Sequence, residues 1–137
     1  MATQLTADTN FVSQGDYRLA AYPLSTTASF VGSYAYLSDT GLLTPVSATT
    51  TTSSLVIGQV VAQGTAILAN ENKAVVRYNG VFEANFGTAA AGFVAGTTVY
   101  LSTDNTISTG SSGANFPKAG IYLGLSQNGN ALVKHDI

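Results

Sequence analysis

The chain has 137 residues, of which only five are basic and seven acidic, so its net charge is −2. This composition offers no basic stripe that could neutralise phosphates, and a nucleic-acid partner is therefore not expected. Cysteine is absent, which excludes disulfides, thiolate metal sites and thiol catalysis. The length suits a single domain with a core of its own.

Residues 1–16 are polar, and the turn signal Gln14-Gly15-Asp16 ends them. We expect an extended N-terminal arm ahead of a single β domain over residues 17–137, and the alternative is a disordered terminus. The arm is rich in threonine and has no proline, which favours extended structure. We predict that it stays mobile until it adds a strand to a sheet edge of a partner or a neighbouring subunit.

The first residues also lack the basic start and the apolar core of a secretory signal. No stretch approaches the roughly 20 apolar residues that a membrane helix needs. We therefore expect a soluble chain with no membrane partner.

Period-2 alternation and turn signals predict a series of short strands. Pro23 ends the first one, and Pro45 suits only an edge or a strand end because it has no N–H to donate. Gly58 interrupts an apolar strand and indicates a bulge or a close approach of two backbones. The predicted strands cover residues 17–22, 30–37, 42–46, 55–62, 73–84, 97–101, 119–125 and 131–136.

Two Asn-Gly pairs lie among these strands. Asn79-Gly80 is compatible with a tight hairpin and equally with a bulge in one long strand. Asn128-Gly129 predicts a two-residue hairpin between the last two strands.

The segments 30–44 and 93–108 are near copies of each other. In both, Phe-Val precedes a short apolar run that ends in Tyr-Leu-Ser, and a polar turn with an aspartate follows. Looser matches continue after each copy, so the repeat halves cover about residues 30–84 and 93–136, which we expect to share one core. The sequence thus predicts an all-β fold, a small β-sandwich or barrel of about eight short strands with an internal repeat and an extended N-terminal arm.

No pattern in the chain indicates an enzyme. His135, the one histidine, precedes Asp136, but neighbouring side chains point to opposite faces of a strand and no nucleophile elbow is present. We expect His135 to be exposed near the terminus. Asp39 and Asp104 lie in the repeated turns, each alone, whereas oxygen-ligand sites gather several acids in one loop. We predict no catalytic residue, no metal site and no cofactor.

Three segments resemble the head decoration proteins of tailed bacteriophages, both the lambda type and a broader group of cement proteins. The first is a Leu-Asp hairpin, YLSD at residues 36–39 through LL at 42–43. The second is an apolar strand with an internal glycine, LVIGQVV at residues 55–61, and the third is a strand with Gly-x-Phe, AVVRYNGVFE at residues 74–83. The resemblance covers residues 30–86, and residues 95–124 are similar to the broader group. In that family the Gly-x-Phe segment is a strand, so the resemblance favours a bulge at Gly80. The chain departs from the lambda type in its length, its repeat and its lack of a proline-rich middle.

The resemblance implies a structural virion protein that is made in the host cytoplasm, binds the outer face of a phage capsid and cements the shell. Its partners would be the major capsid protein and copies of itself, as a homotrimer or, second, a dimer. The arm residues predicted to contact the capsid are Leu5, Thr6, Asn10, Phe11 and Val12.

The alternative is a carbohydrate-binding β-sandwich module of a fibre or surface protein, in which tyrosine rings stack on sugars. Five tyrosines occupy predicted strand positions: Tyr34, Tyr36, Tyr78, Tyr100 and Tyr122. We expect these rings to lie in the core or in a subunit interface.

Overall fold

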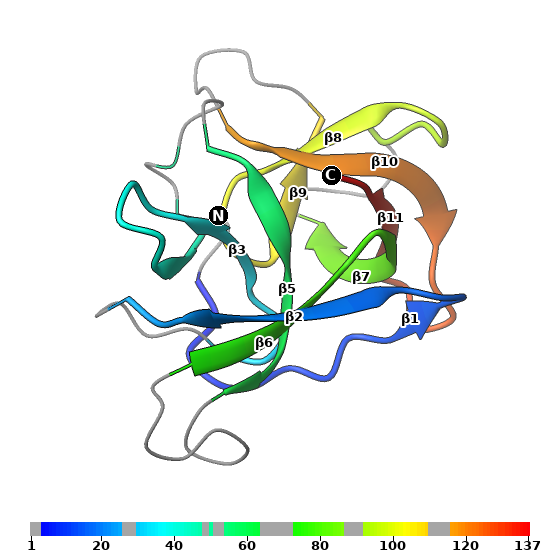
Figure 1. Cartoon of the computed structure of the whole chain (residues 1–137). Coiled ribbons are helices and arrows are strands. Elements are labelled where there is room, and N and C mark those ends of the chain that lie inside the picture. Colours follow the sequence, from blue (N-terminus) through cyan, green and yellow to red (C-terminus); the bar gives the residue numbers. More distant parts are fainter. Residues whose placement is uncertain are drawn as a thin grey trace.

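The computed structural model describes residues 4–25, 30–47, 50, 54–63, 73–86, 92–109 and 116–137. These residues form eleven short strands in two sheets, which confirms the predicted all-β class (Figure 1). The number exceeds the eight expected because the arm contributes one strand, the segment 73–84 divides in two, and Thr106–Ser108 forms a further strand. In the described ranges, no helix is long and apolar enough to span a membrane.

The N-terminal sheet has five antiparallel strands in the order β2-β6-β5-β3-β4. Pro45 ends the outermost strand, and Pro23 ends the strand on the opposite side, as their missing N–H groups require. The strands are β2 (Arg18–Pro23), β3 (Tyr34–Leu37), β4 (Leu43–Pro45), β5 (Val56–Gln63) and β6 (Lys73–Tyr78).

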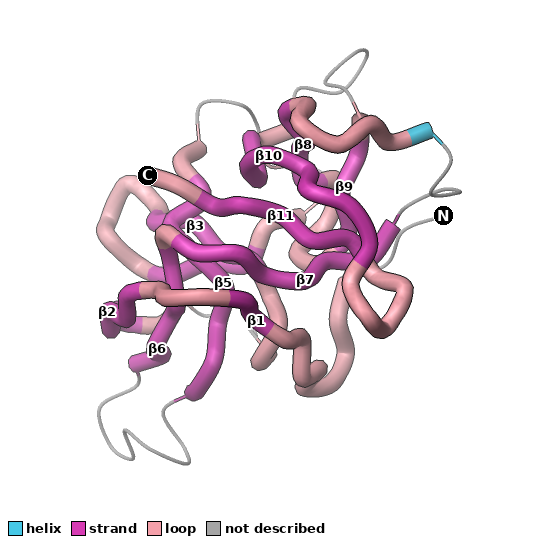
Figure 2. The backbone as a smooth tube through the Cα atoms, turned by 90° about the vertical axis from the view of Figure 1, so that its right-hand side faces the viewer, coloured by secondary structure: helices cyan, strands magenta, loops and turns pink. Residues whose placement is uncertain are grey.

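The second sheet closes into a barrel, which we call the C-terminal barrel. Its strand order is β7-β11-β10-β8-β9, and β9 returns to pair in parallel with β7 (Figure 2). β1 (Ser13–Gln14) adds to β7 from outside the barrel. The barrel strands are β7 (Gly80–Phe86), β8 (Thr98–Leu101), β9 (Thr106–Ser108), β10 (Lys118–Leu125) and β11 (Ala131–His135).

The N-terminal sheet and the C-terminal barrel are copies of one topology. Strands β2, β6, β5, β3 and β4 correspond in order and connection to β7, β11, β10, β8 and β9. Leu24 and Leu43 form a parallel bridge at the place where β7 meets β9 in the barrel. The structural copies begin at β2 and β7, earlier than the segments 30–84 and 93–136 in which the sequence repeat is visible.

The two near-copy segments form the same hairpin. Leu37 pairs with Leu43 in the first, and Leu101 pairs with Ile107 in the second. The matching apolar and turn residues therefore specify the same local register in both copies.

The chain passes from one sheet to the other at Asn79. This residue has φ of 53°, a left-handed conformation that asparagine tolerates. β6 and β7 do not pair, so there is no hairpin, and the expected bulge within one sheet is wrong because the two strands belong to different sheets. A Cβ on Gly80 would lie 2.7 Å from the Cβ of Tyr17, so this corner requires glycine.

The connection between β10 and β11 is longer than the two-residue hairpin expected. It covers residues 126–130, and the Ser126 N–H donates to the Asn130 carbonyl at 2.7 Å. Gly129 supplies the positive φ of 79° that the turn needs.

Each copy has its own apolar core, in place of the single shared core expected. The core of the N-terminal sheet contains Ala35, Leu43, Ile57, Val60, Ala74 and Val76. The core of the barrel contains Phe82, Ala84, Val99, Leu101, Ile107, Ala119, Tyr122, Ala131 and Val133. Tyr34, Val46 and Val56 of the N-terminal sheet pack against the barrel core and form the seam between the copies.

Gly58 and Gly120 occupy equivalent positions, and a Cβ on either would overlap a carbonyl oxygen of the neighbouring strand, that of Arg77 or of Lys134. We expect Gly58→Ala and Gly120→Ala each to lower the free energy of unfolding by about 3 kcal/mol, because backbone must move to admit the methyl group. Urea unfolding measures this. Gly92→Ala is the control, since no atom lies within 4 Å of its Cβ position; equal effects at all three glycines would contradict the close approach.

Candidate functional site

The arm begins by bridging the two copies. Gln4 Nε2 donates to the Val46 carbonyl at 2.8 Å, and Gln4 Oε1 accepts from the Asp104 N–H at 3.2 Å. The Leu5 N–H donates to Asp104 Oδ1 at 3.1 Å. Val46 follows β4 and Asp104 lies in the turn between β8 and β9, so one short segment contacts both copies.

The middle of the arm packs against the chain just before β3. The Thr9 N–H donates to the Val31 carbonyl at 2.8 Å, and the Val31 N–H donates to Asp8 Oδ1 at 3.0 Å. Phe11 is only 8% exposed. A Cβ on Gly32, where φ is 99°, would lie 2.7 Å from the Thr9 carbonyl oxygen, so the arm can approach this closely only because a glycine is present.

The end of the arm adds a strand to β7. The Val12 N–H donates to Glu83 Oε1 at 2.6 Å, and the Glu83 N–H donates to the Val12 carbonyl at 3.1 Å. Ser13 and Gln14 then continue the ladder as β1. Strand addition by the arm therefore occurs, but the edge belongs to the same chain. The expectation of a mobile arm is wrong, since hydrogen bonds within the molecule offset its ordering cost without a partner.

The five predicted capsid contacts divide into two groups. Phe11 is buried, and Leu5 and Val12 are half-buried against the molecule itself. Thr6 and Asn10 keep exposed side chains. Three of the five therefore hold the arm in place, and two remain accessible on its outer side.

Glu83 anchors the end of the arm as a buried carboxylate with 0% exposure. It accepts from Ser126 Oγ at 2.5 Å, from Asn130 Nδ2 at 3.2 Å and from the Val12 N–H. Burial by itself raises the pKa of Glu83, but the hydrogen bonds from Ser126, Val12, Asn130 and Asn128 outweigh it and hold the pKa below its usual value. Both carboxylate oxygens are occupied, so Glu83 acts as a structural acceptor.

Arg77 and Gln59 join the N-terminal sheet, the barrel and the arm at one point of the seam. Arg77 donates to Gln59 Oε1 from Nε at 2.9 Å and from Nη2 at 2.6 Å, and Nη2 also donates to the Phe11 carbonyl at 2.8 Å. Gln59 Nε2 donates to the carbonyls of Gly32 and Glu83, each at 3.1 Å. Arg77 Nε and Nη2 and both polar atoms of the Gln59 amide therefore have partners, as buried polar groups require.

Asp104 anchors the beginning of the arm and is 2% exposed. It accepts from Ser33 Oγ at 2.7 Å, from Asn105 Nδ2 at 2.8 Å and from the Leu5 N–H. Burial raises the pKa of Asp104, and these hydrogen bonds oppose the shift. Asp39, in the corresponding hairpin turn of the other copy, is exposed, so the two turns serve different purposes. Among the described residues, no group of three or more histidines and acids could hold a metal ion.

Sequence reasoning did not identify the buried polar residues Gln59, Arg77 and Glu83, although a signal for them exists. Gln59, Arg77 and Glu83 each interrupt an apolar strand. A polar residue at such a position is buried only when partners satisfy it, so it predicts a hydrogen-bonded contact between elements. The turn sequence around Asp104 gives no such signal, since its contact with Leu5 joins residues 99 positions apart.

His135 is buried, with 2% exposure, which corrects the expected exposed histidine. Its Nδ1 accepts from the Asn79 N–H at 3.2 Å, and its Nε2 lies 2.8 Å from the Val56 carbonyl. Because Nδ1 accepts, Nε2 carries the proton and donates to that carbonyl, so the ring is neutral. The histidine thus joins β11 to β5 and to the corner at Asn79.

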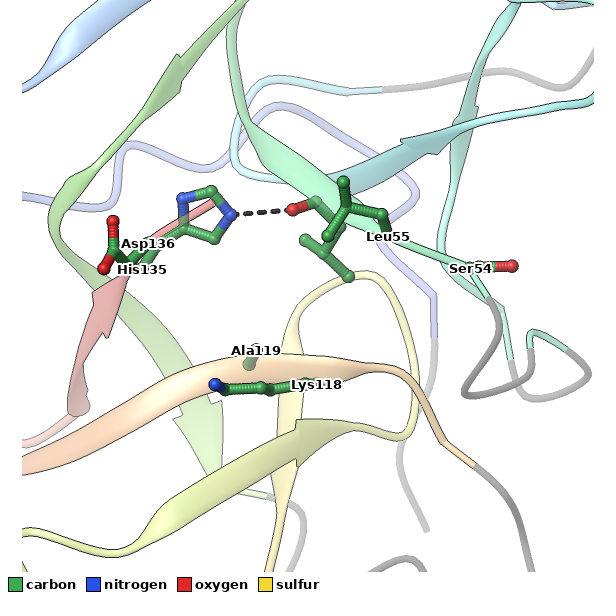
Figure 3. A pocket seen from close by; sticks show the side chains of 7 residues that line it. Ser54, Leu55, Lys118, Ala119, His135 and Asp136 are labelled. Atoms are coloured by element: carbon green, nitrogen blue, oxygen red, sulfur yellow. Dashed lines mark hydrogen bonds between the residues drawn. The ribbon is translucent and has the colours of Figure 1, made fainter.

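A cavity of about 210 Å³ beside His135 also includes Ser54 and Asp136, and these three residue types could form a catalytic triad. Figure 3 shows that they do not, since Ser54 lies beyond Leu55 and points away from the imidazole. Both ring nitrogens are already bonded to backbone groups, so His135 cannot take a proton from a serine in this arrangement.

The tyrosines considered as sugar platforms are engaged in packing. Tyr34 and Tyr122 are buried, and Tyr36, Tyr78 and Tyr100 are half-buried. The Tyr34 hydroxyl donates to the Glu83 carbonyl at 3.0 Å across the seam. These contacts agree with the expected core positions.

Comparison of the chain with protein-family models, with curated proteins and with solved structures finds no match.

Replacement of Phe11 by alanine should lower the free energy of unfolding by about 3 kcal/mol, since the side chain is nearly buried and its loss leaves a cavity under the arm. Chemical denaturation of the full chain measures the change. Thr6→Ala and Asn10→Ala are matched arm controls with exposed side chains, and each should change stability by less than about 0.5 kcal/mol. A Phe11→Ala protein as stable as the parent would show that the arm is not docked.

Stability should also fall as the pH drops below about 6.5, the ordinary pKa of histidine. Burial lowers the pKa of His135, against the opposing effects of the Val56 hydrogen bond and the Asp136 charge. The unfolded chain therefore takes up the proton first, and stability present above about pH 6.5 is lost as the pH falls towards the folded pKa. Thermal unfolding between about pH 7 and pH 5 should show a steeper loss for the parent than for His135→Gln; parallel profiles would refute the assignment.

Proposed function

We propose that this protein is a structural virion protein that binds the outer face of a phage capsid, through the major capsid protein, and stabilises the shell. The main support is that ionisable side chains in the interior of the protein make hydrogen bonds that hold the fold together. Arg77, Glu83, Asp104 and His135 are all buried and hydrogen-bonded within the molecule. A small scaffold fixed in this way suits a cement, which must add binding energy without changing shape.

The surface composition also supports a protein that is covered by partners. Several large apolar side chains are exposed: Tyr17, Leu19, Leu55, Val94, Leu123, Leu125 and Ile137. Charged residues are scarce in the whole sequence, with five basic and seven acidic side chains. Protein interfaces are depleted of charged residues and contain apolar ones at their centre, and the protein as a whole exposes apolar side chains and carries few charges.

The exposed side of the arm is the part of the predicted contact that the fold leaves free. Thr6 and Asn10 would face the capsid, and Leu5, Phe11 and Val12 would hold the arm in the right position. Because the arm is already ordered, binding would not incur the cost of ordering it.

Each copy that spans neighbouring capsid subunits would contribute its binding free energy to the assembled shell alone. Copies would associate with one another on the virion surface, as the homotrimer that the sequence resemblance implies, or as a dimer. The five tyrosines at predicted strand positions are buried or half-buried, which disfavours the carbohydrate-binding alternative.

Decorated shells should release their contents at a higher temperature than bare shells, because the bound protein must dissociate before the lattice opens. Genome or dye release on heating measures this, and co-sedimentation confirms binding. The variant Thr6→Asp with Asn10→Asp should fold normally yet fail to co-sediment or protect, while Thr40→Asp in an exposed turn of the N-terminal sheet is the matched control. Identical release temperatures for decorated and bare shells would exclude the cement role.

A further inference from the structure

The equivalent strands β7 and β2 differ at their outer edges. In the C-terminal barrel, β1 pairs with β7 at residues 81–82 and β9 pairs with it at residues 85–86. In the N-terminal sheet, β2 has the closing bridge between Leu24 and Leu43, and no described strand pairs with the rest of that edge. The position that the arm fills beside β7 is therefore not taken by any described strand beside β2, which crosses the front of the molecule (Figure 1).

The backbone groups that face the open edge can be assigned. The Ser25 N–H donates to the Leu43 carbonyl at 3.0 Å on the closing side, so alternate residues before it, Pro23, Ala21 and Leu19, face the same side. Pro23 has no N–H and could not serve the ladder to β6, which agrees with this assignment. Leu19 and Ala21 thus direct their N–H and C=O groups to the free edge.

This edge has little protection against pairing. Proteins usually blunt an edge strand with charges, bulges or irregular register. β2 pairs with β6 over six residues without a register shift, and its one charged residue is Arg18. Leu19 is 58% exposed beside it, so the edge is regular, extended and apolar.

We propose that β2 pairs antiparallel with β2 of a second copy of this chain, across a two-fold axis centred on Ala20. Leu19 then lies opposite Ala21 of the second copy, and this pair exchanges two backbone hydrogen bonds, as does its symmetry mate. The two sheets become one continuous sheet, and the outward N–H and C=O groups of both copies are satisfied.

The side chains of β2 complement their own copies in this register. The exposed Leu19 packs beside Ala21 of the second copy on the outer face, and Arg18 lies beside Tyr22 of the second copy, where a cation–π contact can form. No like charges meet along the strand, and the net charge of −2 opposes association only weakly. A strand with this symmetry of contacts favours a second copy over an unrelated partner. The contact is two-fold and produces dimers; a trimer would use another surface.

Sedimentation velocity of the full chain, from micromolar to millimolar concentration, should show a monomer–dimer equilibrium. Hydrogen exchange tests the register, because the Leu19 and Ala21 amides should gain protection as dimer forms, while the Ala20 and Tyr22 amides, bonded to β6, stay protected throughout. A chain that remains monomeric overturns the proposal, and so does a dimer in which the Leu19 and Ala21 amides still exchange freely. Protection of these two amides at every concentration also overturns it, since the edge would then be covered in the monomer.

Two variants address the edge directly. Ala21→Pro removes one outward N–H from each copy, and Leu19→Lys places charge beside the partner strand; each should weaken dimerisation about tenfold or more. Leu125→Lys is the matched control, because Leu125 is 59% exposed on β10 of the C-terminal barrel, on a different strand from β2. This substitution should leave the dimer unchanged. Thermal unfolding establishes that each variant is folded. Folded edge variants that dimerise like the parent would refute the β2 contact, independently of any result with capsids.

Discussion

The buried guanidinium of Arg77 is the constraint on which the seam depends. A buried charge without partners would destabilise the fold by several kcal/mol, so Arg77 requires acceptors from other elements. Gln59 provides one, and the carbonyl of Phe11 in the arm provides another. Gln59 in turn donates to the Glu83 carbonyl of β7. The path of the arm and the contact between the copies are therefore parts of one hydrogen-bonded unit.

The two copies contain equivalent cross-strand residue pairs, and only the pair in the N-terminal sheet is buried at the seam. Gln59 pairs with Arg77 in the N-terminal sheet, as Ile121 pairs with Lys134 in the barrel. Arg77 and Gln59 are buried, whereas Lys134 is exposed and Ile121 is half-buried. The two copies have the same strand topology and differ in what covers each face of their sheets. The same asymmetry distinguishes the covered edge of β7 from the open edge of β2.

This division of roles fits a protein that works by contact. The interior polar groups fix the relative position of the two copies, and Thr6 and Asn10 extend from a segment that is already ordered. Surfaces without charge protection, such as the β2 edge, are then available for association. A rigid interior and surfaces that can associate with other proteins are the properties that a capsid cement would need.

The sequence by itself determined most of the strands, the turns of the near-copy segments 30–44 and 93–108 and the internal repeat, because alternation and turn chemistry act between near neighbours in the chain. It also limited Pro23 and Pro45 to strand ends. Only the tertiary structure decided the path of the arm, the burial of His135 and the corner at Asn79. The contacts responsible join residues far apart, as between Leu5 and Asp104, 99 positions away. Alternation indicates which face of a strand is buried, but the partner of a polar group depends on which distant backbone the fold brings beside it.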